Sequence, residues 1–303
     1  MPTIHLPFRA ADPFIMRASD RRYYLYSTNE DGGGFPVHVS KNLIDWESCG
    51  LVLSEKSARW GVSRFWAPEC YKVRGKYYLF YSADWKDNPT GTLENFRIGV
   101  AVADAPAGPF EDISDRPVFD PGYPVIDADV YEEDGRYYLY YSRCSYQHDV
   151  GGLEESWIYG VELKPDFSGI IGEPVLLLRP EQEWEGRSAA QTGRRWNEGS
   201  YLMRHGGKYI MTYSANFYAG ADYAVGYATA DHPLGPYVKA AENPILERSA
   251  QITGPGHSCM FHATDGQLMI CYHGYTGKSG KNRVGFISPA HITEDGRLVI
   301  DKD

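Results

Sequence analysis

The stretch DADVYEEDGRYYLYYS, residues 127–142, indicates the fold, because it is one of five related stretches along the chain. The other four are DPFIMRASDRRYYLYS at 12–27, APECYKVRGKYYLFYS at 67–82, EGSYLMRHGGKYIMTYS at 198–214 and HSCMFHATDGQLMICYH at 257–273. Successive copies begin 55, 60, 71 and 59 residues apart, so together they span nearly the whole polypeptide. A recurring unit of about 40 to 70 residues is typical of the blades of a β-propeller.

Each copy reads as two antiparallel strands joined by a tight turn. In the copy quoted first, the turn EDGR at 133–136 lies between an apolar segment and a Tyr-rich one. A looser pattern, seen in VGYATADHPLGPY from Val225, adds a third strand, a turn marked by Pro and Gly, and a short fourth strand. We therefore predict an all-β fold, a five-bladed β-propeller with four antiparallel strands per blade. β-Sandwiches and β-helices do not repeat at this length.

The domain organisation follows from the continuity of the repeat. No Pro/Gly/Ser-rich linker or shift in composition interrupts it, so we predict a single propeller domain over residues 1–303. The longest interval between copies carries an insertion at 179–196, rich in Arg, Glu, Gln and Trp. We expect a short helix or a long rim loop there, and we expect the insertion to narrow the pocket.

Composition limits the partners of this protein. The formal net charge is −10 and the pI is about 5.4, whereas nucleic acids and anionic membranes select basic patches. We therefore expect neither of them as a partner and expect a neutral ligand instead. No apolar run approaches the length of a membrane span. The oligomeric state stays open.

The cysteines and the N-terminal sequence bear on the compartment. The five cysteines are widely separated and form no CxxC pair; they are Cys49, Cys70, Cys144, Cys259 and Cys271. Their odd number and spacing favour reduced thiols, and the first residues lack the basic and apolar segments of a secretory signal. We therefore expect a cytoplasmic protein, although removal of a signal peptide from a secreted protein would leave part of the same pattern.

Equivalent positions of the repeat place acidic residues around one axis. In a propeller the first strand of each blade runs beside the central channel. The residues that open the copies of blades one, three, four and five are Asp12, Asp127, Glu198 and His257, and Trp66 precedes the copy of blade two. Three carboxyl groups and an imidazole are therefore expected at one end of the channel. Clustered like charges cost stability and are tolerated mainly where chemistry needs shifted pKa values.

Two carboxyl groups across a pocket are what the hydrolysis of a glycosidic bond needs. One of them, protonated, donates to the leaving oxygen, while the other stays ionised and works on the opposite face of the sugar. A third carboxylate can keep the pKa of the acid high. The gap between the pair distinguishes inverting from retaining enzymes, and the sequence leaves that gap open.

Five motifs, taken in chain order, carry a family resemblance. They are ADP at 11–13, FWAPE at 65–69, IDADV at 126–130, NEG at 197–199 and GPGH at 254–257. In this order the chain resembles, over essentially its whole length, the five-bladed propeller enzymes of glycoside hydrolase family 43. That family contains β-xylosidases, α-L-arabinofuranosidases and arabinanases, which act with inversion of configuration.

The resemblance assigns a role to each acidic residue of the motifs. Asp12 would be the general base that activates water, Glu198 the general acid, and Asp127 the carboxylate that orients the acid and tunes its pKa. Asp129 is a rival to Asp127, because side chains two apart on a strand point the same way. Glu69 resembles the acid of an invertase-like PEC motif, but it falls in blade two, and we expect it to be structural.

The resemblance also implies residues that contact the substrate. Trp66 resembles an aromatic wall on which a sugar ring stacks, with packing between blades as the alternative. Arg283 resembles an arginine that contacts sugar hydroxyls, with an exposed strand position as the alternative. In many relatives the histidine equivalent to His257 lies at the channel centre near a calcium ion or a water cluster. We therefore expect His257 to contact substrate or to be a candidate ligand of Ca²⁺, directly or through water, with a metal-free axial histidine as the alternative.

The predicted function is that of an exo-acting, inverting glycoside hydrolase that releases L-arabinofuranose or D-xylose from plant cell-wall oligosaccharides. An endo-1,5-α-L-arabinanase is the alternative within the same chemistry. A carbohydrate-binding propeller without catalysis is the alternative from another class, and it is disfavoured because all three acidic positions are present. No organic cofactor is expected.

Overall fold

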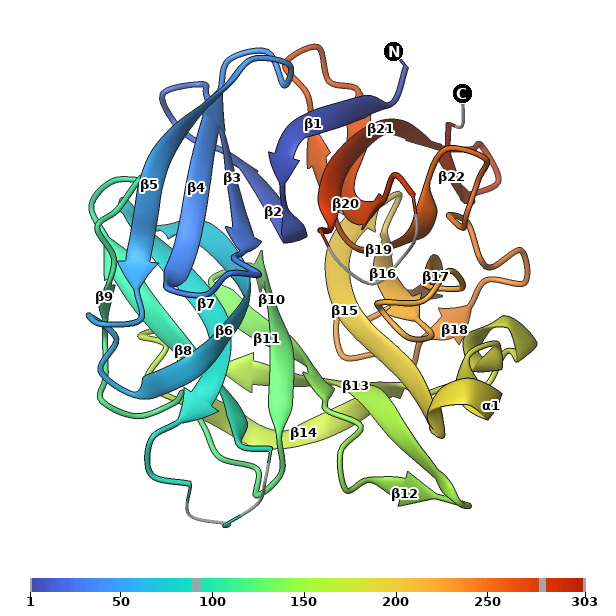
Figure 1. Cartoon of the computed structure of the whole chain (residues 1–303), viewed down its shortest axis with the longest axis horizontal. Helices are drawn as coiled ribbons and strands as arrows, with labels where there is room; N and C mark the ends of the chain where they lie inside the picture. Colours follow the sequence, from blue (N-terminus) through green and yellow to red (C-terminus); the bar gives the residue numbers. More distant parts are fainter. Residues whose placement is uncertain (1, 89–90, 92–93, 278–281, 302–303) are drawn as a thin grey trace.

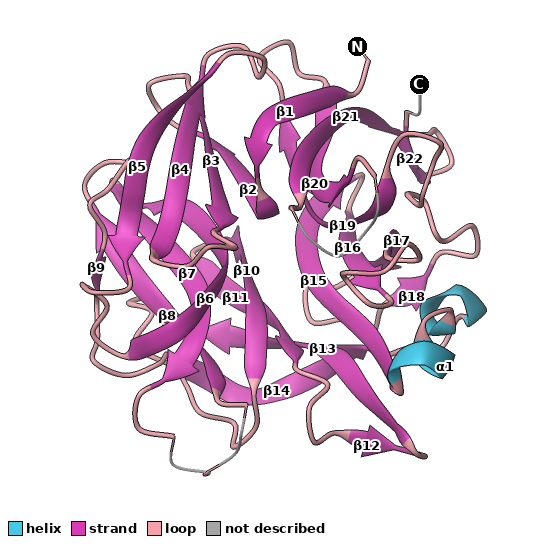
Figure 2. Ribbon diagram, in the orientation of Figure 1, coloured by secondary structure: helices cyan, strands magenta, loops and turns pink. Residues whose placement is uncertain are grey.

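The computed structural model describes residues 2–88, 91, 94–277 and 282–301. Strands dominate the described part of the chain (Figure 2), and the α-helix drawn beside them, α1 (Ala189–Thr192), is a single turn. The strands form successive antiparallel units of the kind that the repeat predicts. The prediction of an all-β propeller is therefore confirmed, whereas the limits of the domain stay a prediction.

Each blade contributes its strands in chain order from the channel outward. Blade one consists of β2 (Ala11–Arg17), β3 (Tyr23–Thr28), β4 (Gly34–Ser40) and β5 (Trp46–Ser54). Blade two consists of β6 (Gly61–Val73), β7 (Lys76–Trp85), β8 (Phe96–Ala103) and β9 (Glu111–Asp112). Blade three consists of β10 (Val125–Glu133), β11 (Arg136–Arg143), β13 (Leu153–Leu163) and β14 (Ile170–Leu178), with β12 (Asp149–Val150) paired to β13. Blade four consists of β15 (Arg194–His205), β16 (Lys208–Ala215), β17 (Ala224–Ala230) and β18 (Val238–Lys239).

Blade five joins the two ends of the chain. Its continuous strands are β19 (Thr253–His262), β20 (Leu268–Tyr275) and β21 (Val284–Ile292). The outer edge of β21 pairs with β1 (Ile4–Arg9) along its first half and with β22 (Leu298–Ile300) along its second half. The two termini therefore lie near each other (Figure 1), and the closing blade uses strands from both.

The first strands of the five blades surround a central channel (Figure 1). Each of them contacts the first strands of both neighbouring blades, so the ring is closed. The Tyr-rich second strands are buried on both faces because blades stack against one another, and β3 is buried along its whole length. The five copies of the repeat therefore provide the packing between blades as well as the lining of the channel.

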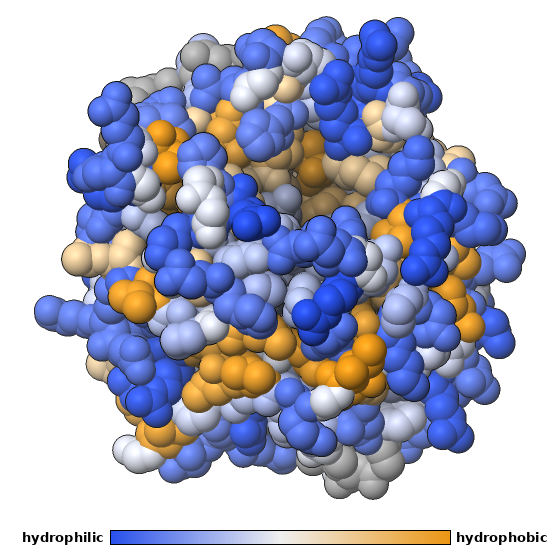
Figure 3. Space-filling view, turned by 180° about the vertical axis from the view of Figure 1, so that it is seen from behind, coloured by the Kyte–Doolittle hydropathy of each residue, from blue (hydrophilic) through white to orange (hydrophobic). Residues whose placement is uncertain are grey.

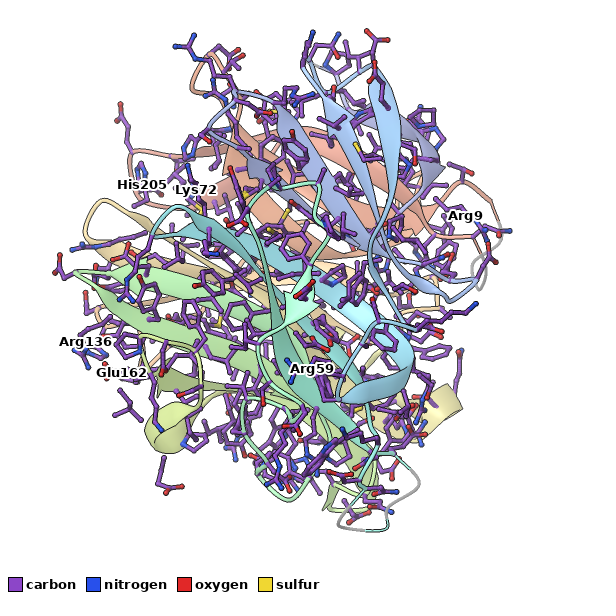
Figure 4. The ribbon with its side chains drawn as sticks, turned by 90° about the vertical axis from the view of Figure 1, so that its left-hand side faces the viewer. Arg9, Arg59, Lys72, Arg136, Glu162 and His205 are labelled. Atoms are coloured by element: carbon purple, nitrogen blue, oxygen red, sulfur yellow. The ribbon has the colours of Figure 1, made fainter. Side chains whose placement is uncertain are left out.

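The two mouths of the channel differ. Figure 4 shows Arg9 at one end of the molecule and Lys72 and His205, beside the hairpin turns of the repeat, at the other. At the hairpin end there is a hollow of about 470 Å³ whose walls include the apolar side chains of Met16, Met203 and Phe261. Figure 3 shows this face, with apolar residues inside a hollow that hydrophilic residues surround.

The insertion at 179–196 forms two short helical turns, η1 (Glu183–Gly186) and α1, as expected for a short helix. Glu185 anchors it: its Oε2 accepts from the N–H of Gln182 at 2.7 Å, and its Oε1 accepts from Tyr213 at 2.8 Å.

Among the described residues, none of the helices has the length and hydropathy needed to span a bilayer. All five cysteines lie in the described part of the chain and are free thiols.

Candidate active site

A bulge at the same place in every first strand builds the site. In blade one, Ala11 pairs with Thr28 and Phe14 with Tyr26, so two residues of β2 lie opposite one residue of β3. The first residue of each bulge has a left-handed backbone. These residues are Asp12 (φ 48°), Ala67 (φ 48°), Asp127 (φ 59°), Gly199 (φ 55°) and His257 (φ 48°). Left-handed φ is rare outside glycine, and bulges that redirect side chains are concentrated next to active sites.

A polar side chain from the preceding blade caps most of these bulges. The backbone N–H of the left-handed residue donates to the side chain of a residue at the end of the neighbouring second strand. The pairs are Ala67 with Thr28 (2.8 Å), Asp127 with Ser82 (3.0 Å), His257 with Ser214 (2.7 Å) and Asp12 with Nδ1 of His273 (3.1 Å). A residue at the end of one second strand therefore fixes the turn that opens the next copy of the repeat.

Blade four departs from the predicted ring by one residue. The sequence places Glu198 at the position of Asp12, whereas the structure places Gly199 there. Glu198 pairs with Ser214 and is equivalent to Trp66 of blade two, one residue before the bulge. This part of the prediction is wrong because glycine adopts left-handed φ without steric cost, so the bulge forms at Gly199. The side chain of Glu198 still lines the common pocket.

The pocket lies at the channel end that carries the bulges and has a volume of about 450 Å³. Its walls contain all three predicted catalytic residues, Asp12, Asp127 and Glu198. The three predicted substrate-contacting residues, Trp66, His257 and Arg283, line it as well. Neither Asp129 nor Glu69 does. The structure therefore brings together the residues that the motifs select and leaves out the two rivals.

Asp12 is held as a carboxylate by positive charge. Its Oδ1 accepts from Nη1 of Arg283 at 2.7 Å, and its Oδ2 accepts from the hydroxyl of Thr28 at 2.7 Å. Burial on its own would raise the pKa of Asp12, but the guanidinium of Arg283 and the ring of His257 outweigh it and hold that pKa below its usual range. Asp12 is therefore ionised throughout the working range of pH, as a general base must be.

His273 supports Asp12 without pairing with it as an ion. Burial and the nearby Arg283 hold the pKa of His273 well below its usual value, so its ring is neutral. Its Nδ1 accepts the backbone N–H of Asp12, which fixes the tautomer with the proton on Nε2. The 3.4 Å between Nδ1 of His273 and Oδ1 of Asp12 is therefore a contact between two acceptors, not a salt bridge.

Glu198 has the opposite environment. Burial and the negative charge of Asp127 raise its pKa well above the usual value, while the hydroxyl of Tyr223, which donates to Oε1 at 3.0 Å, opposes that shift. Asp127 accepts at Oδ2 from the N–H of Gly199 and from the hydroxyl of Ser142, both at 3.2 Å. Asp127 is thus fixed beside the residue that follows Glu198 and keeps Glu198 protonated.

Glu69 and Asp129 form a separate pair one step further along the channel. The hydroxyl of Tyr71 contacts Oε2 of Glu69 and lies 2.9 Å from Oδ1 of Asp129, while it accepts the N–H of Val130 at 2.9 Å. One hydroxyl has a single proton to donate, so one of the two carboxyl groups must carry its own proton. The N–H of Leu202 donates to Asp129 at 2.7 Å, which favours the ionised form of Asp129 and leaves the proton on Glu69. The pair is structural in this geometry, as expected for Glu69.

Three features of the pocket were not predicted from the sequence motifs. Glu30 accepts both the backbone N–H and Nε of Arg283 at 3.1 Å, so Arg283 bridges Glu30 and Asp12 instead of lying on an exposed strand. Tyr223 contacts Glu198. The rim between β3 and β4, residues 28–34, lines the pocket, whereas no residue of the insertion at 179–196 does. The expectation that the insertion narrows the pocket is therefore wrong; Glu185 instead binds the insertion to Tyr213 on β16 and to Lys239 on β18.

Trp66 forms an aromatic wall of the pocket. Trp66 lies on Phe96 at 4.4 Å between ring centroids, and Arg64 lies over the ring of Phe96 at 4.2 Å, so Trp66 is held in place from one side while it lines the pocket. Among the described residues, no group of three or more His, Cys, Asp or Glu side chains is arranged to hold a metal ion. The donor set around His257 includes the cation Arg283 beside Asp12, which does not suit calcium. Calcium at His257 therefore stays a prediction.

The fold and the pocket define a class, that of propeller enzymes in which carboxyl groups of unlike pKa face one cavity. The family model described as "Glycosyl hydrolases family 43" matches residues 4–298. The chain belongs to this family and is a glycoside hydrolase, with a carbohydrate as its substrate.

Individual relatives agree with this membership. An extracellular exo-α-(1→5)-L-arabinofuranosidase of Streptomyces chartreusis is 28% identical over 87% of this chain and 79% of its own length. A xylosidase/arabinosidase of Bacteroides ovatus is 30% identical over 75% of each chain. Among solved structures, a thermostable family-43 glycoside hydrolase superposes with a TM-score of 0.90 at 37% identity, covering 99% of this chain and 96% of its own.

Proposed function

We propose that this enzyme is an exo-acting, inverting glycosidase that releases L-arabinofuranose or D-xylose from plant cell-wall oligosaccharides. Glu198 protonates the leaving oxygen, Asp12 accepts a proton from the attacking water, and Asp127 holds the pKa of Glu198 high. The bond between the anomeric carbon and the leaving oxygen breaks as the water forms the new one. Trp66 and Arg283 bind the sugar that is released.

One observation carries this proposal. Two carboxyl groups of the same pocket have their pKa values moved in opposite directions, down for Asp12 and up for Glu198. Two carboxyl groups whose pKa values are separated in this way provide a base and an acid at neutral pH, and glycoside hydrolysis needs one of each.

The names of relatives and the size of the pocket support the sugar and the exo mode. The two curated relatives described above are named for arabinofuranoside and xyloside cleavage, and the Streptomyces enzyme is named as exo-acting. A volume of about 450 Å³, bounded on one side by residues 28–34, suits a short sugar better than a long polymer groove.

The test is a comparison of substrates with the purified protein. We expect hydrolysis of an aryl α-L-arabinofuranoside or an aryl β-D-xyloside, and release of monosaccharide from the matching oligosaccharides. Release of oligosaccharides from linear arabinan with little monosaccharide would support the endo-arabinanase instead, a name that relatives from Aspergillus niger carry. Binding of sugar without any turnover would reject catalysis altogether.

Replacement of Glu198 by Ala tests the acid assignment within the same assay. The loss of kcat is expected to be severe on natural oligosaccharides, whose leaving groups need a proton, and smaller on activated aryl glycosides, which do not. Equal losses on both kinds of substrate would contradict the role of Glu198.

A further inference from the structure

Tyr223 contacts Glu198 from a segment that none of the sequence motifs includes. It lies immediately before β17, is almost fully buried, and lines the pocket together with Glu198. Its hydroxyl donates to Oε1 of Glu198 at 3.0 Å. Burial and the charge of Glu198 raise the pKa of Tyr223 well above its usual value, so the hydroxyl keeps its proton and stays a donor.

The ring of Tyr223 is held rigidly from two sides. It stacks on the ring of His273 at 5.6 Å between centroids with 13° between the planes. On another side it lies against the backbone of Gly256, where a Cβ atom would be 2.2 Å from Cε1 of Tyr223. The second glycine of the GPGH motif therefore makes room for this ring, and the hydroxyl has a fixed position relative to Glu198.

The two carboxyl oxygens of Glu198 therefore differ in their hydrogen bonding. Oε1 accepts the proton of Tyr223, whereas Oε2 has no hydrogen-bond partner among the described residues. Since Glu198 lines the pocket, a substrate can reach its side chain. The carbonyl oxygen of a protonated carboxyl group is a better acceptor than its hydroxyl oxygen, so the bond from Tyr223 to Oε1 favours the acidic proton on Oε2.

We propose that Tyr223 is a positioning residue of the hydrolytic reaction, which keeps the proton of Glu198 on the oxygen that faces the substrate and stabilises the carboxylate left after transfer. The proton moves from Oε2 of Glu198 to the leaving oxygen as the glycosidic bond breaks. The bond from Tyr223 to Oε1 then becomes charge-assisted and stronger, so it favours the transition state over the ground state. This role rests on the proposed function, in which Glu198 is the acid.

Other groups also act on the charge of Glu198, and all of them remain when the hydroxyl of Tyr223 is removed. They are Asp127 on β10, Asp12 on β2 and Arg283, which immediately precedes β21. The others are His257 on β19, which lies beside Gly199, Cys144, which follows β11, and Tyr218 in the segment after β16. A change of pH profile on removing the hydroxyl alone therefore reports the bond between Tyr223 and Glu198.

The test compares Tyr223→Phe with wild type on a series of aryl glycosides with graded leaving groups. Loss of a donor to the charged form raises the pKa of Glu198, so the alkaline limb of kcat/KM moves to higher pH by about one unit. For poor leaving groups kcat falls on the order of tenfold, and for activated ones it falls less, with KM little changed. An unshifted alkaline limb together with an unchanged dependence on the leaving group would overturn the proposal.

The matched control is Tyr140→Phe. Tyr140 is as deeply buried, and its hydroxyl donates to the carbonyl of Pro233 at 3.0 Å, but it does not line the pocket. It is expected to lower stability by a similar amount while leaving the pH profile in place. Failure of the proposed function is recognised separately: if Glu198→Ala loses activity equally on all leaving groups, Glu198 is not the acid.

Replacement of Tyr223 by 3-fluorotyrosine gives a second measurement that does not depend on the stability of the Phe variant. Fluorine makes the phenol a stronger donor, so the carboxylate of Glu198 is stabilised further and the alkaline limb is expected at lower pH. A shift in the same direction as that of Tyr223→Phe, or no shift in either variant, would contradict a donor role for the hydroxyl.

Discussion

The residues Asp12 and Glu198 line the same pocket, yet their neighbours differ in charge. Arg283 is bound to Asp12, whereas Glu198 has the carboxylate of Asp127 nearby and a phenol as its hydrogen-bond donor. The difference is produced by residues on three different blades. A base and an acid of the same chemical type are thereby kept in opposite protonation states.

Removal of Arg283 therefore has a predictable effect on pH dependence. Without the guanidinium, burial dominates and the pKa of Asp12 rises. Because the base must be ionised, we expect the acidic limb of kcat/KM to move to higher pH in Arg283→Met, along with a reduced maximum. Arg22→Met, which removes an exposed arginine paired with Asp20, is the control and should leave both limbs in place. An acidic limb that stays where it is in Arg283→Met would count against Asp12 as the base.

Contacts made by residues outside the repeated stretches were the part of the site that the sequence could not predict. The equivalence of Asp12 and Asp127 follows from the repeat, because each copy folds in the same way. The bonds from Tyr223 to Glu198 and from Arg283 to Glu30 join segments that have no counterpart in the other copies. No pattern in a single sequence indicates such a contact.

At the scale of the element, the bulge is the unit that the repeat specifies. The sequence predicted the blades, the hairpins and the ring of side chains, but it placed blade four one residue too early. The available signal was Gly199, since a glycine after the acid marks the left-handed position. The insertion was predicted correctly as a short helix and incorrectly as part of the pocket, because its packing depends on the buried Glu185 and not on its length.

The buried pair of Glu69 and Asp129 predicts how the free energy of unfolding depends on pH. Glu69 is neutral in the folded protein, since burial and Asp129 raise its pKa well above the usual value, and burial raises the pKa of Asp129 itself to about 7. A folded-state pKa above the unfolded one gives stability that is full at low pH and is lost as pH rises through the folded value. This pair therefore contributes a decrease in the free energy of unfolding from about pH 4 to beyond pH 7.

Glu69→Gln tests that contribution, because glutamine keeps the shape and a donor for Tyr71 without a group that titrates. We expect the free energy of unfolding of this variant, measured by denaturant titration, to fall less than that of wild type between about pH 5 and 8. Glu173→Gln, at an exposed position, should follow wild type. Identical pH profiles for Glu69→Gln and wild type would show that Glu69 is ionised in the folded protein.

For the whole molecule, closure of the ring is the feature on which the geometry of the site depends. The pocket takes side chains from all five blades, and the last blade is completed by β1 at the N-terminal end. Leu6 on β1 is buried against β21, where a Cβ atom at Gly285 would lie 2.5 Å from its Cδ1. Arg283, which binds Asp12, immediately precedes β21.

Weakening this closure is expected to lower stability and activity together. Leu6→Ala should reduce the free energy of unfolding by about 2 to 5 kcal/mol, as is typical of buried leucines, and should reduce activity at temperatures well below the unfolding midpoint of wild type. Ile44→Ala, at an exposed site, should change neither. A fully stable Leu6→Ala protein would mean that β1 is not needed to close the ring.

The configuration of the first product shows whether Asp12 activates water while Glu198 donates its proton in a single displacement. Proton NMR spectra recorded in the first minutes of hydrolysis, before mutarotation, show which anomer forms. We expect β-L-arabinofuranose from an α-L-arabinofuranoside, or α-D-xylose from a β-D-xyloside. Initial formation of the anomer with retained configuration would contradict it, because retention requires a covalent intermediate that these roles do not include.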